Sequence, residues 1–228
     1  MNALGTLDWI GLALLVALWS GYSVWAARAQ THAPSLMTSL ARYRRVWMRE
    51  AYRRENKMTD VALTGSLMQS ATFFSSTTLL ILGGLFAVLG TVEKSAELVR
   101  SLPFATRTSQ ELLEMKALAL TLVFVYAFFR FTWSMRQFNL VNILIGAFPA
   151  QREHQVADDR MIEQAARLNE LAGRNFTHGL RSYYYAVPLM LWLINPWLLA
   201  IGAVVITGVT WYMEFRSPTV RALLAERE

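Results

Sequence analysis

The segment from Val61 to Val92, VALTGSLMQSATFFSSTTLLILGGLFAVLGTV, runs for about 30 residues without a charged side chain. A helix rises ~1.5 Å per residue and the hydrocarbon core of a bilayer is ~30 Å thick, so about 20 such residues are enough for one crossing. The segment is too long and too apolar to be the core helix of a soluble domain. Lipid is therefore the expected solvent for most of this chain.

Similar apolar segments lie on both sides of this one. We predict an all-α fold, a polytopic membrane helical bundle with four transmembrane helices and additional cytoplasmic amphipathic helices. The chain has no room for a separate soluble domain, so residues 1–228 are expected to form a single transmembrane domain. The predicted spans cover about residues 7–27, 62–90, 117–136 and 183–213.

Two of the predicted boundaries stay open. The third span either ends near Arg136 or continues into the cytoplasm as a longer rod. The last segment is longer than one crossing and contains Pro188 and the dipeptide Asn195-Pro196. Because proline removes a backbone hydrogen bond inside a helix, we expect a kinked helix, or a half-helix that leads into a full crossing at residues 197–213. A separate cytoplasmic helix is expected at residues 156–171, ended by Gly173.

Composition narrows the function. Of the 228 residues, 54% are hydrophobic and only 17% are charged, against about 25% charged in a soluble domain. The absence of cysteine excludes disulfides, thiolate catalysis and cysteine-based metal sites. No histidine stands in a metal-binding spacing, so we expect neither a metal nor a cofactor, and no enzymatic activity. The net charge of +6 reflects basic residues beside membrane spans, and we expect no nucleic-acid partner.

The positions of the basic residues predict the topology. No Lys or Arg precedes the first span, whereas many follow it. The protein is therefore expected in the cell inner membrane with its N-terminus on the external side. Four crossings then place the C-terminus outside as well. Residues 35–57 read as a basic amphipathic helix along the inner leaflet, or alternatively as a soluble linker helix. In the first interpretation its arginines contact anionic lipid: Arg42, Arg44, Arg45, Arg49, Arg53 and Arg54.

The second span is rich in small and hydroxyl residues. Ala62, Gln69, Ser76, Gly83 and Gly90 recur at every seventh position. Such residues allow close helix packing in lipid, which predicts a central helix with protein on more than one side and a homo-oligomer. The alternative is a hydrated path lined by three polar residues of one face and narrowed by an aromatic ring: Gln69, Thr72, Ser76 and Phe73.

Arg130 is the sharpest single feature of the third span. Counted from Ala117, it lies ~20 Å into the membrane, where a charge costs at least ~2.5–3.5 kcal/mol. It either faces the bundle interior as an anion-attracting group or snorkels to the inner interface. No acidic residue except Asp8 lies within a predicted span, so a buried Arg130 would have an anionic ligand or backbone carbonyls as its partner. Three nearby polar residues are further candidates for the path: Arg136, Gln137 and Asn139.

Several motifs together resemble the domain-of-unknown-function 599 (DUF599) membrane proteins. They are the segments 45–48 (RVWM), 70–84 (SATFFSSTTLLILGG), 126–139 (YAFFRFTWSMRQFN), 146–149 (GAFP) and 174–185 (RNFTHGLRSYYY). The resemblance covers nearly the whole chain. It implies a bacterial multi-span membrane protein with relatives in plants, and it supplies no activity and no catalytic residue.

Two functions follow from these observations. The first is an oligomeric channel or transporter for a small ion or a small polar or anionic solute, with a pathway through the second and third spans. The alternative is a non-transporting membrane scaffold that binds lipid or a partner through its basic cytoplasmic loops.

Overall fold

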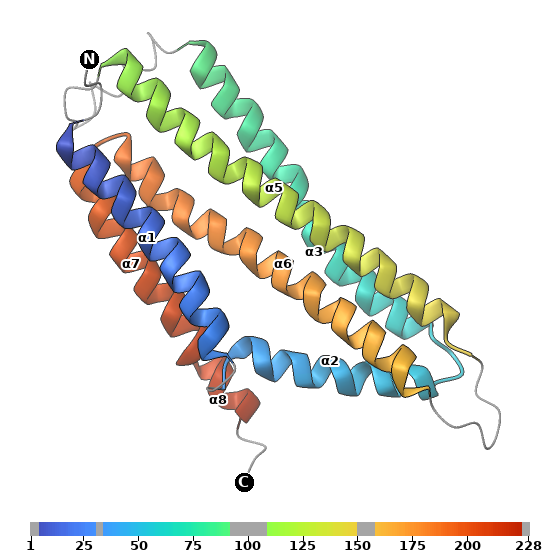
Figure 1. Cartoon of the computed structure of the whole chain (residues 1–228). Helices are drawn as coiled ribbons and strands as arrows, with labels where there is room; N and C mark the ends of the chain where they lie inside the picture. The colour runs from blue at the N-terminus through green and yellow to red at the C-terminus, as the bar shows by residue number, and fades with distance from the viewer. Residues whose placement is uncertain (1–4, 31–33, 92–108, 150–157, 225–228) are drawn as a thin grey trace.

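The computed structural model describes residues 5–30, 34–91, 109–149 and 158–224 (Figure 1). Within these ranges the chain is helical, which confirms the predicted fold class. The helices are α1 (Thr6–Ala29), α2 (Leu36–Arg53), α3 (Met58–Gly90), α5 (Gln110–Ala147), α6 (Asp159–Trp192), α7 (Pro196–Phe215) and α8 (Pro218–Leu224).

Side-chain caps fix where several helices begin. The Ser35 hydroxyl accepts from the backbone N–H of Thr38 (3.3 Å), and the Thr38 hydroxyl accepts from the N–H of Ser35 (2.9 Å), so α2 starts with a reciprocal cap. At the start of α5 the Ser109 hydroxyl accepts one hydrogen bond from the backbone N–H of Leu112 (3.2 Å). α5 therefore begins directly after Ser109, seven residues before the predicted start of the third span.

The bundle has apolar residues outside and charged residues inside. Large side chains such as Leu80 (78% exposed) and Phe129 (64% exposed) point away from the protein. Among the described residues, five acidic or basic side chains are buried instead: Asp8, Asp60, Lys116, Arg181 and Glu214. Four helices are long and apolar enough to cross a membrane, namely α1, α3, α5 and α7 with the following α8. This distribution is that of a membrane protein, because lipid is the favourable surroundings for the exposed apolar surface.

Two hydrophobic clusters hold the helices together along the long α5–α6 pair. One joins α1, α5, α6 and α7 through residues such as Leu15, Phe124, Trp192 and Leu199. The other packs α2 against the C-terminal part of α5 and the N-terminal part of α6, with Met48 and Val141 fully buried. α3 packs along α5 (Figure 1). We call the end of the bundle that carries α2 the α2 end, and the opposite one, where α1 and α7 begin, the N-terminal end.

The predicted last segment, residues 183–213, is not a single kinked helix, whereas the alternative of a full crossing at residues 197–213 agrees with α7. α6 ends at Trp192 and α7 begins at Pro196, with Asn195 as its cap (Asn195 Oδ1 to Trp197 N, 2.9 Å). The two helices run antiparallel, because the residue number on α6 falls as the number of its contact on α7 rises. The three contacts are Pro188 with Gly202, Tyr185 with Thr207, and Arg181 with Glu214. The dipeptide at 195–196 is the turn of a helical hairpin.

Two other boundaries also differ from the simple expectation. α5 continues to Ala147, so the longer-rod alternative for the third span is the observed one. α6 does not stop at Gly173 but runs through it and through Pro188. At both positions tertiary contacts outweigh local propensity: the guanidinium of Arg44 packs against the bare backbone of Gly173, and Pro188 packs on Gly202.

Within one chain α3 lies at the edge of the bundle, not at its centre as predicted. Its buried residues, among them Ala71, Ser75 and Leu82, form a single stripe, and its main packing partner is α5. Only 17% of its most apolar window is buried. Protein on more than one side of α3 would have to come from another molecule.

The α6–α7 hairpin also changes the topology. Gly11 of α1 contacts Leu199 near the start of α7, and Tyr22 bonds Glu214 near its end, so α1 and α7 are parallel. The described ends of the chain therefore lie at opposite ends of the bundle (Figure 1). The expectation of two external termini rested on a single last crossing, and the hairpin removes that basis.

Candidate functional site

The path residues predicted on α3 all face away from the rest of the chain. Gln69, Thr72 and Ser76 are exposed, and Phe73 is 64% exposed. The Thr72 hydroxyl donates to the carbonyl of Met68 (3.0 Å), so this hydroxyl is satisfied within the helix itself. A single copy of the described chain does not bring these residues together with the polar residues of α5.

Arg130 lies half-buried between α5 and α6. Its Nε donates to the Tyr126 hydroxyl (2.8 Å) and its Nη1 to Oδ1 of Asn175 (2.7 Å). Nδ2 of Asn175 donates onward to Oε1 of Gln137 (2.7 Å), and Gln137 is buried. The structure thus joins two predicted site residues, Arg130 and Gln137, through one amide that sequence reasoning did not single out. The partners are neutral, so Arg130 keeps its full positive charge.

The other two candidates of α5 are not part of this cluster. Asn139 is exposed. Arg136 is exposed as well and lies over the ring of Trp133, with 5.8 Å from its guanidinium carbon to the ring centroid. Such a contact holds a cation at an exposed aromatic ring and builds no enclosed site.

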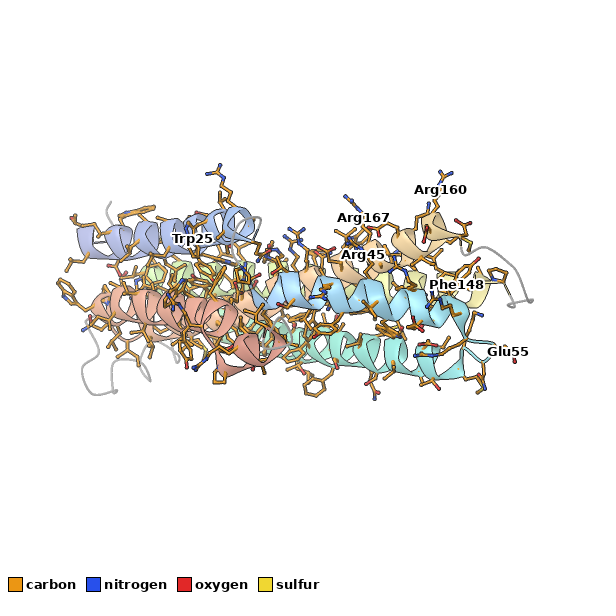
Figure 2. The ribbon with its side chains drawn as sticks, turned by 90° about the horizontal axis from the view of Figure 1, so that it is seen from below. Trp25, Arg45, Glu55, Phe148, Arg160 and Arg167 are labelled. Carbon is orange, nitrogen blue, oxygen red and sulfur yellow. The ribbon has the colours of Figure 1, made fainter. Side chains whose placement is uncertain are left out.

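The six arginines predicted to contact lipid divide into three groups. Arg45, Arg53 and Arg54 form ion pairs with Glu163 (3.0 Å), Glu50 (3.1 Å) and the buried Asp60 (2.5 Å), respectively. Figure 2 shows Arg45 of α2 on the same side of the molecule as Arg160 and Arg167 of α6. Arg42 and Arg49 are also exposed, and neither forms an ion pair with a carboxylate among the described residues.

Arg44, the sixth of them, turns inward. Burial lowers the pKa of its guanidinium, and the nearby carboxylate of Glu170 opposes that shift. Its Nη1 has no hydrogen-bond partner among the described residues, and neither has the side chain of the fully buried Asn169, four residues before Gly173 on α6. Arg44 therefore serves the α2–α6 contact and is not free to meet a membrane surface.

A buried ion pair closes the N-terminal end. Nζ of the fully buried Lys116 donates to the carbonyl of Trp192 (2.8 Å) and lies 3.6 Å from Oδ1 of Asp8. The same oxygen of Asp8 accepts from the indole Nε1 of Trp192 (2.8 Å). The three residues tie α1, α5 and the end of α6 together. Lys116 lies one residue before the predicted start of the third span.

A second buried ion pair lies nearer the α2 end. Arg181 of α6 donates from Nε to Oε1 of Glu214 (2.7 Å) and from Nη2 to Oε2 (2.5 Å). The hydroxyl of Tyr22 donates to the same Oε2 (2.7 Å), and the Arg181 guanidinium lies over the Tyr22 ring. A bidentate pair that is 5% and 9% exposed connects α1, α6 and α7. It corrects the statement that Asp8 alone is acidic within the spans.

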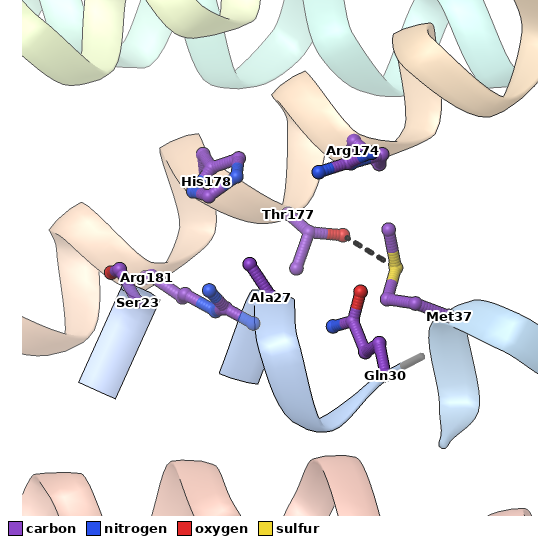
Figure 3. Close-up of a pocket in the computed structure, with 8 residues that line it drawn as sticks. All are labelled: Ser23, Ala27, Gln30, Met37, Arg174, Thr177, His178 and Arg181. Carbon is purple, nitrogen blue, oxygen red and sulfur yellow. Dashed lines mark hydrogen bonds between the residues drawn. The ribbon is translucent and has the colours of Figure 1, made fainter. Parts of the chain in front are cut away.

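Arg181 also borders a small pocket between α1, α2 and α6 (Figure 3). The pocket leaves about 20 Å³ for the centre of a water-sized sphere, which is enough for one or two water molecules or a small ion. The described lining residues contain no carboxylate: Ser23, Ala27, Gln30, Met37, Arg174, Thr177, His178 and Arg181. The Thr177 hydroxyl is engaged with Met37 and with the carbonyl of Gly173.

The remaining polar groups give this pocket a positive potential. Arg174 forms no ion pair with a carboxylate among the described residues. α6, which carries Arg174 and His178, is not one of the four candidate spans. Burial, and to a smaller extent the charges of Arg181, Arg130 and Arg174, lower the pKa of His178 to about 4. His178 is therefore neutral at pH 7.

A family model described as "Protein of unknown function, DUF599" matches residues 10–219. The chain belongs to the DUF599 family. No curated protein and no solved structure matches it. The DUF599 match covers all four candidate spans in large part, together with both buried ion pairs except Asp8, and it confirms the resemblance seen in the motifs.

Sequence reasoning missed the pocket because its residues come from three separate segments of this DUF599 chain. Arg174 and Arg181 lie before the predicted start of the last span, and Glu214 lies one residue beyond its predicted end. The available signal was Asn195-Pro196, since Asn at a cap followed by Pro at the first position is a helix start. Read that way, it predicts the hairpin that brings Arg181 to Glu214.

Proposed function

We propose that this DUF599 protein is an integral membrane protein that binds a small anion in the pocket between α1, α2 and α6 and moves it across the membrane. The observation that carries the proposal is the pocket itself, in which Arg174, Arg181 and the neutral His178 meet without a lining carboxylate. A carboxylate-free cationic pocket attracts anions, and its limited size favours a small one.

The orientation of the chain follows from its basic residues. α2 carries several arginines, and the N-terminal end of α1 carries none. By the positive-inside rule the α2 end is cytoplasmic, which places the pocket at the inner side of the inner membrane. The N-terminus is then external and the C-terminus cytoplasmic, because α7 runs parallel to α1.

Passage across the membrane would require more than one copy. The exposed face of α3 carries the Gln69 amide, for which the described chain shows no partner, and Gly65 and Gly83, where a Cβ would meet nothing within 4 Å. In lipid, bare backbone and an unpaired amide favour helix–helix contact. We propose a homo-oligomer in which α3 helices face one another, so that Gln69, Thr72 and Ser76 line the contact or a path within it.

The assembly can be tested directly because the chain has no cysteine. A single Gln69→Cys variant in native membranes should form disulfide-linked dimers with copper phenanthroline. Val209→Cys, which is equally lipid-exposed on α7, is the matched control and should stay monomeric. Equal cross-linking of both variants would contradict an α3 interface.

Anion transport is tested with purified protein in proteoliposomes. Chloride or nitrate efflux should depend on Arg174, so Arg174→Gln should reduce it at least tenfold. Arg167→Gln removes the same charge from an exposed position of α6 outside the pocket and should leave the flux unchanged. Equal flux in the Arg174→Gln variant and the parent would remove the pocket as the anion site.

A membrane scaffold is the second candidate function. Its supporting observation is the pair Arg42 and Arg49, exposed on α2 without an ion-pair partner in the described chain. Basic residues near anionic lipid contribute about 1 kcal/mol each. In this case Arg42→Gln with Arg49→Gln should weaken retention of anionic lipid during purification, and the proteoliposomes should show no anion flux.

A further inference from the structure

Glu214 stands behind the pocket as an internal counter-ion. Arg181 lines the pocket, and both of its hydrogen-bonding contacts to Glu214 are short, at 2.7 and 2.5 Å. Tyr22 donates a third hydrogen bond to the same carboxylate. Because Arg181 is 5% exposed and Glu214 9%, little water screens the pair.

The charges at the pocket can be counted from these contacts. Arg174 contributes one positive charge without a carboxylate partner in the described chain. Arg181 and Glu214 cancel each other, and His178 is neutral near pH 7 because its pKa is about 4. The net charge is +1. Arg130 adds to the electrostatic potential at His178 but does not line the pocket. A substitution at Glu214 leaves the charge of Arg130 as it is.

We propose that Glu214 is the specificity-determining residue of the pocket, and that it restricts the site to a singly charged anion such as chloride or nitrate. This inference rests on the proposed function. A doubly charged anion such as sulfate would retain one uncompensated charge in a space where water is limited, and burying an unpaired charge is costly. Without the Glu214 carboxylate, Arg181 would supply the second positive charge, and sulfate would become the matched ligand.

The experiment compares chloride with sulfate, each measured by isothermal titration calorimetry of the full chain in detergent, with gluconate keeping the ionic strength constant. The parent protein should bind chloride in preference to sulfate. Glu214→Gln should raise the ratio of sulfate affinity to chloride affinity at least tenfold. Glu163→Gln removes the same charge from an exposed ion pair on α6 outside the pocket lining and should leave the ratio unchanged.

A second pair of variants covers the case in which Glu214→Gln does not fold. Arg181→Gln lowers the net charge of the pocket to zero and should abolish the binding of both ions. Arg181→Gln combined with Glu214→Gln returns the net charge to +1 without leaving a buried charge unpaired, and it should restore chloride binding with little sulfate binding.

The outcomes separate this inference from the proposed function. Chloride binding by the parent protein with an unchanged ratio in Glu214→Gln, or no recovery in the double variant, would overturn the role of Glu214 alone. A parent protein that binds neither chloride nor sulfate would overturn the anion site and this inference with it.

Discussion

The ion pair at the N-terminal end provides the sharpest test of the fold. Asp8→Asn removes one negative charge but leaves an amide oxygen that can still accept from the indole of Trp192. Lys116 would then be a fully buried ammonium without a charged partner, in contact with the Trp192 carbonyl at 2.8 Å and over the Trp192 ring at 5.3 Å from its centroid. The substitution also removes Oδ2, which accepts from the Gly5 N–H (3.2 Å) at the start of α1, but its main effect is on the charge of the pair.

The magnitude follows from the separation of the two charges. At 3.6 Å and an effective dielectric constant of about 20, Coulomb's law gives about 4–5 kcal/mol. Breaking a buried pair by removing one partner typically costs about 3–5 kcal/mol. We therefore expect Asp8→Asn to lower the free energy of unfolding by about 3–5 kcal/mol, and Lys116→Met by a similar amount.

The double variant Asp8→Asn with Lys116→Met should recover most of this loss. It leaves no unpaired charge, and its main defect is the lost donor to the Trp192 carbonyl, about 1 kcal/mol. The free energies come from unfolding in mixed micelles with increasing SDS. The exposed pair Arg45–Glu163 serves as the reference, because such pairs contribute about 0.2–1 kcal/mol. Single variants that lose less than 1 kcal/mol, or losses that simply add in the double variant, would refute a buried ion pair.

Other perturbations test other parts of the structure. Gly179→Ala should destabilise the protein by about 1–3 kcal/mol, since its Cβ would lie 2.6 Å from the ring of Phe131, whereas Gly208→Ala, with open space around it, should be neutral or slightly stabilising in thermal unfolding. The lowered pKa of His178 means that the unfolded chain binds a proton more readily, so stability should fall as the pH drops from about 6.5 to 4, and His178→Asn should remove this slope. Chloride affinity should rise over the lower part of the same range in the parent protein, as His178 gains a charge.

The helices that cross the membrane follow from the sequence because each depends on a long local signal. An uncharged apolar segment as long as residues 61–92 is stable in lipid and not in water, and its length matches a helix that crosses the bilayer. α2 is equally local, since its apolar stripe and its Ser35 cap lie within one segment. These features need no knowledge of what each helix packs against.

The features that sequence reasoning missed depend on contacts between distant segments. Gly173 reads as a stop signal, yet here its missing side chain admits the guanidinium of Arg44 from α2. Pro188 reads as a break, yet α6 continues because the ring packs on Gly202 across the hairpin. In each case the local cost is real, and a partner more than ten residues away makes the helix favourable.

The charged residues show the same distinction at the candidate site. Arginines of α2 that look alike in the sequence lie in different surroundings, with Arg42 exposed and Arg44 half-buried against α6, because an 18-residue helix packed on α6 has one inner face. Arg181 and Glu214, which look like two ordinary interfacial charges, become one neutral pair, and Arg174 stays unneutralised a short distance away. The charge available to a ligand therefore depends on the hairpin between α6 and α7 and cannot be counted from the sequence. A change that shifts this hairpin by one helical turn would separate Arg181 from Glu214 and alter the anion preference without touching a residue that lines the pocket.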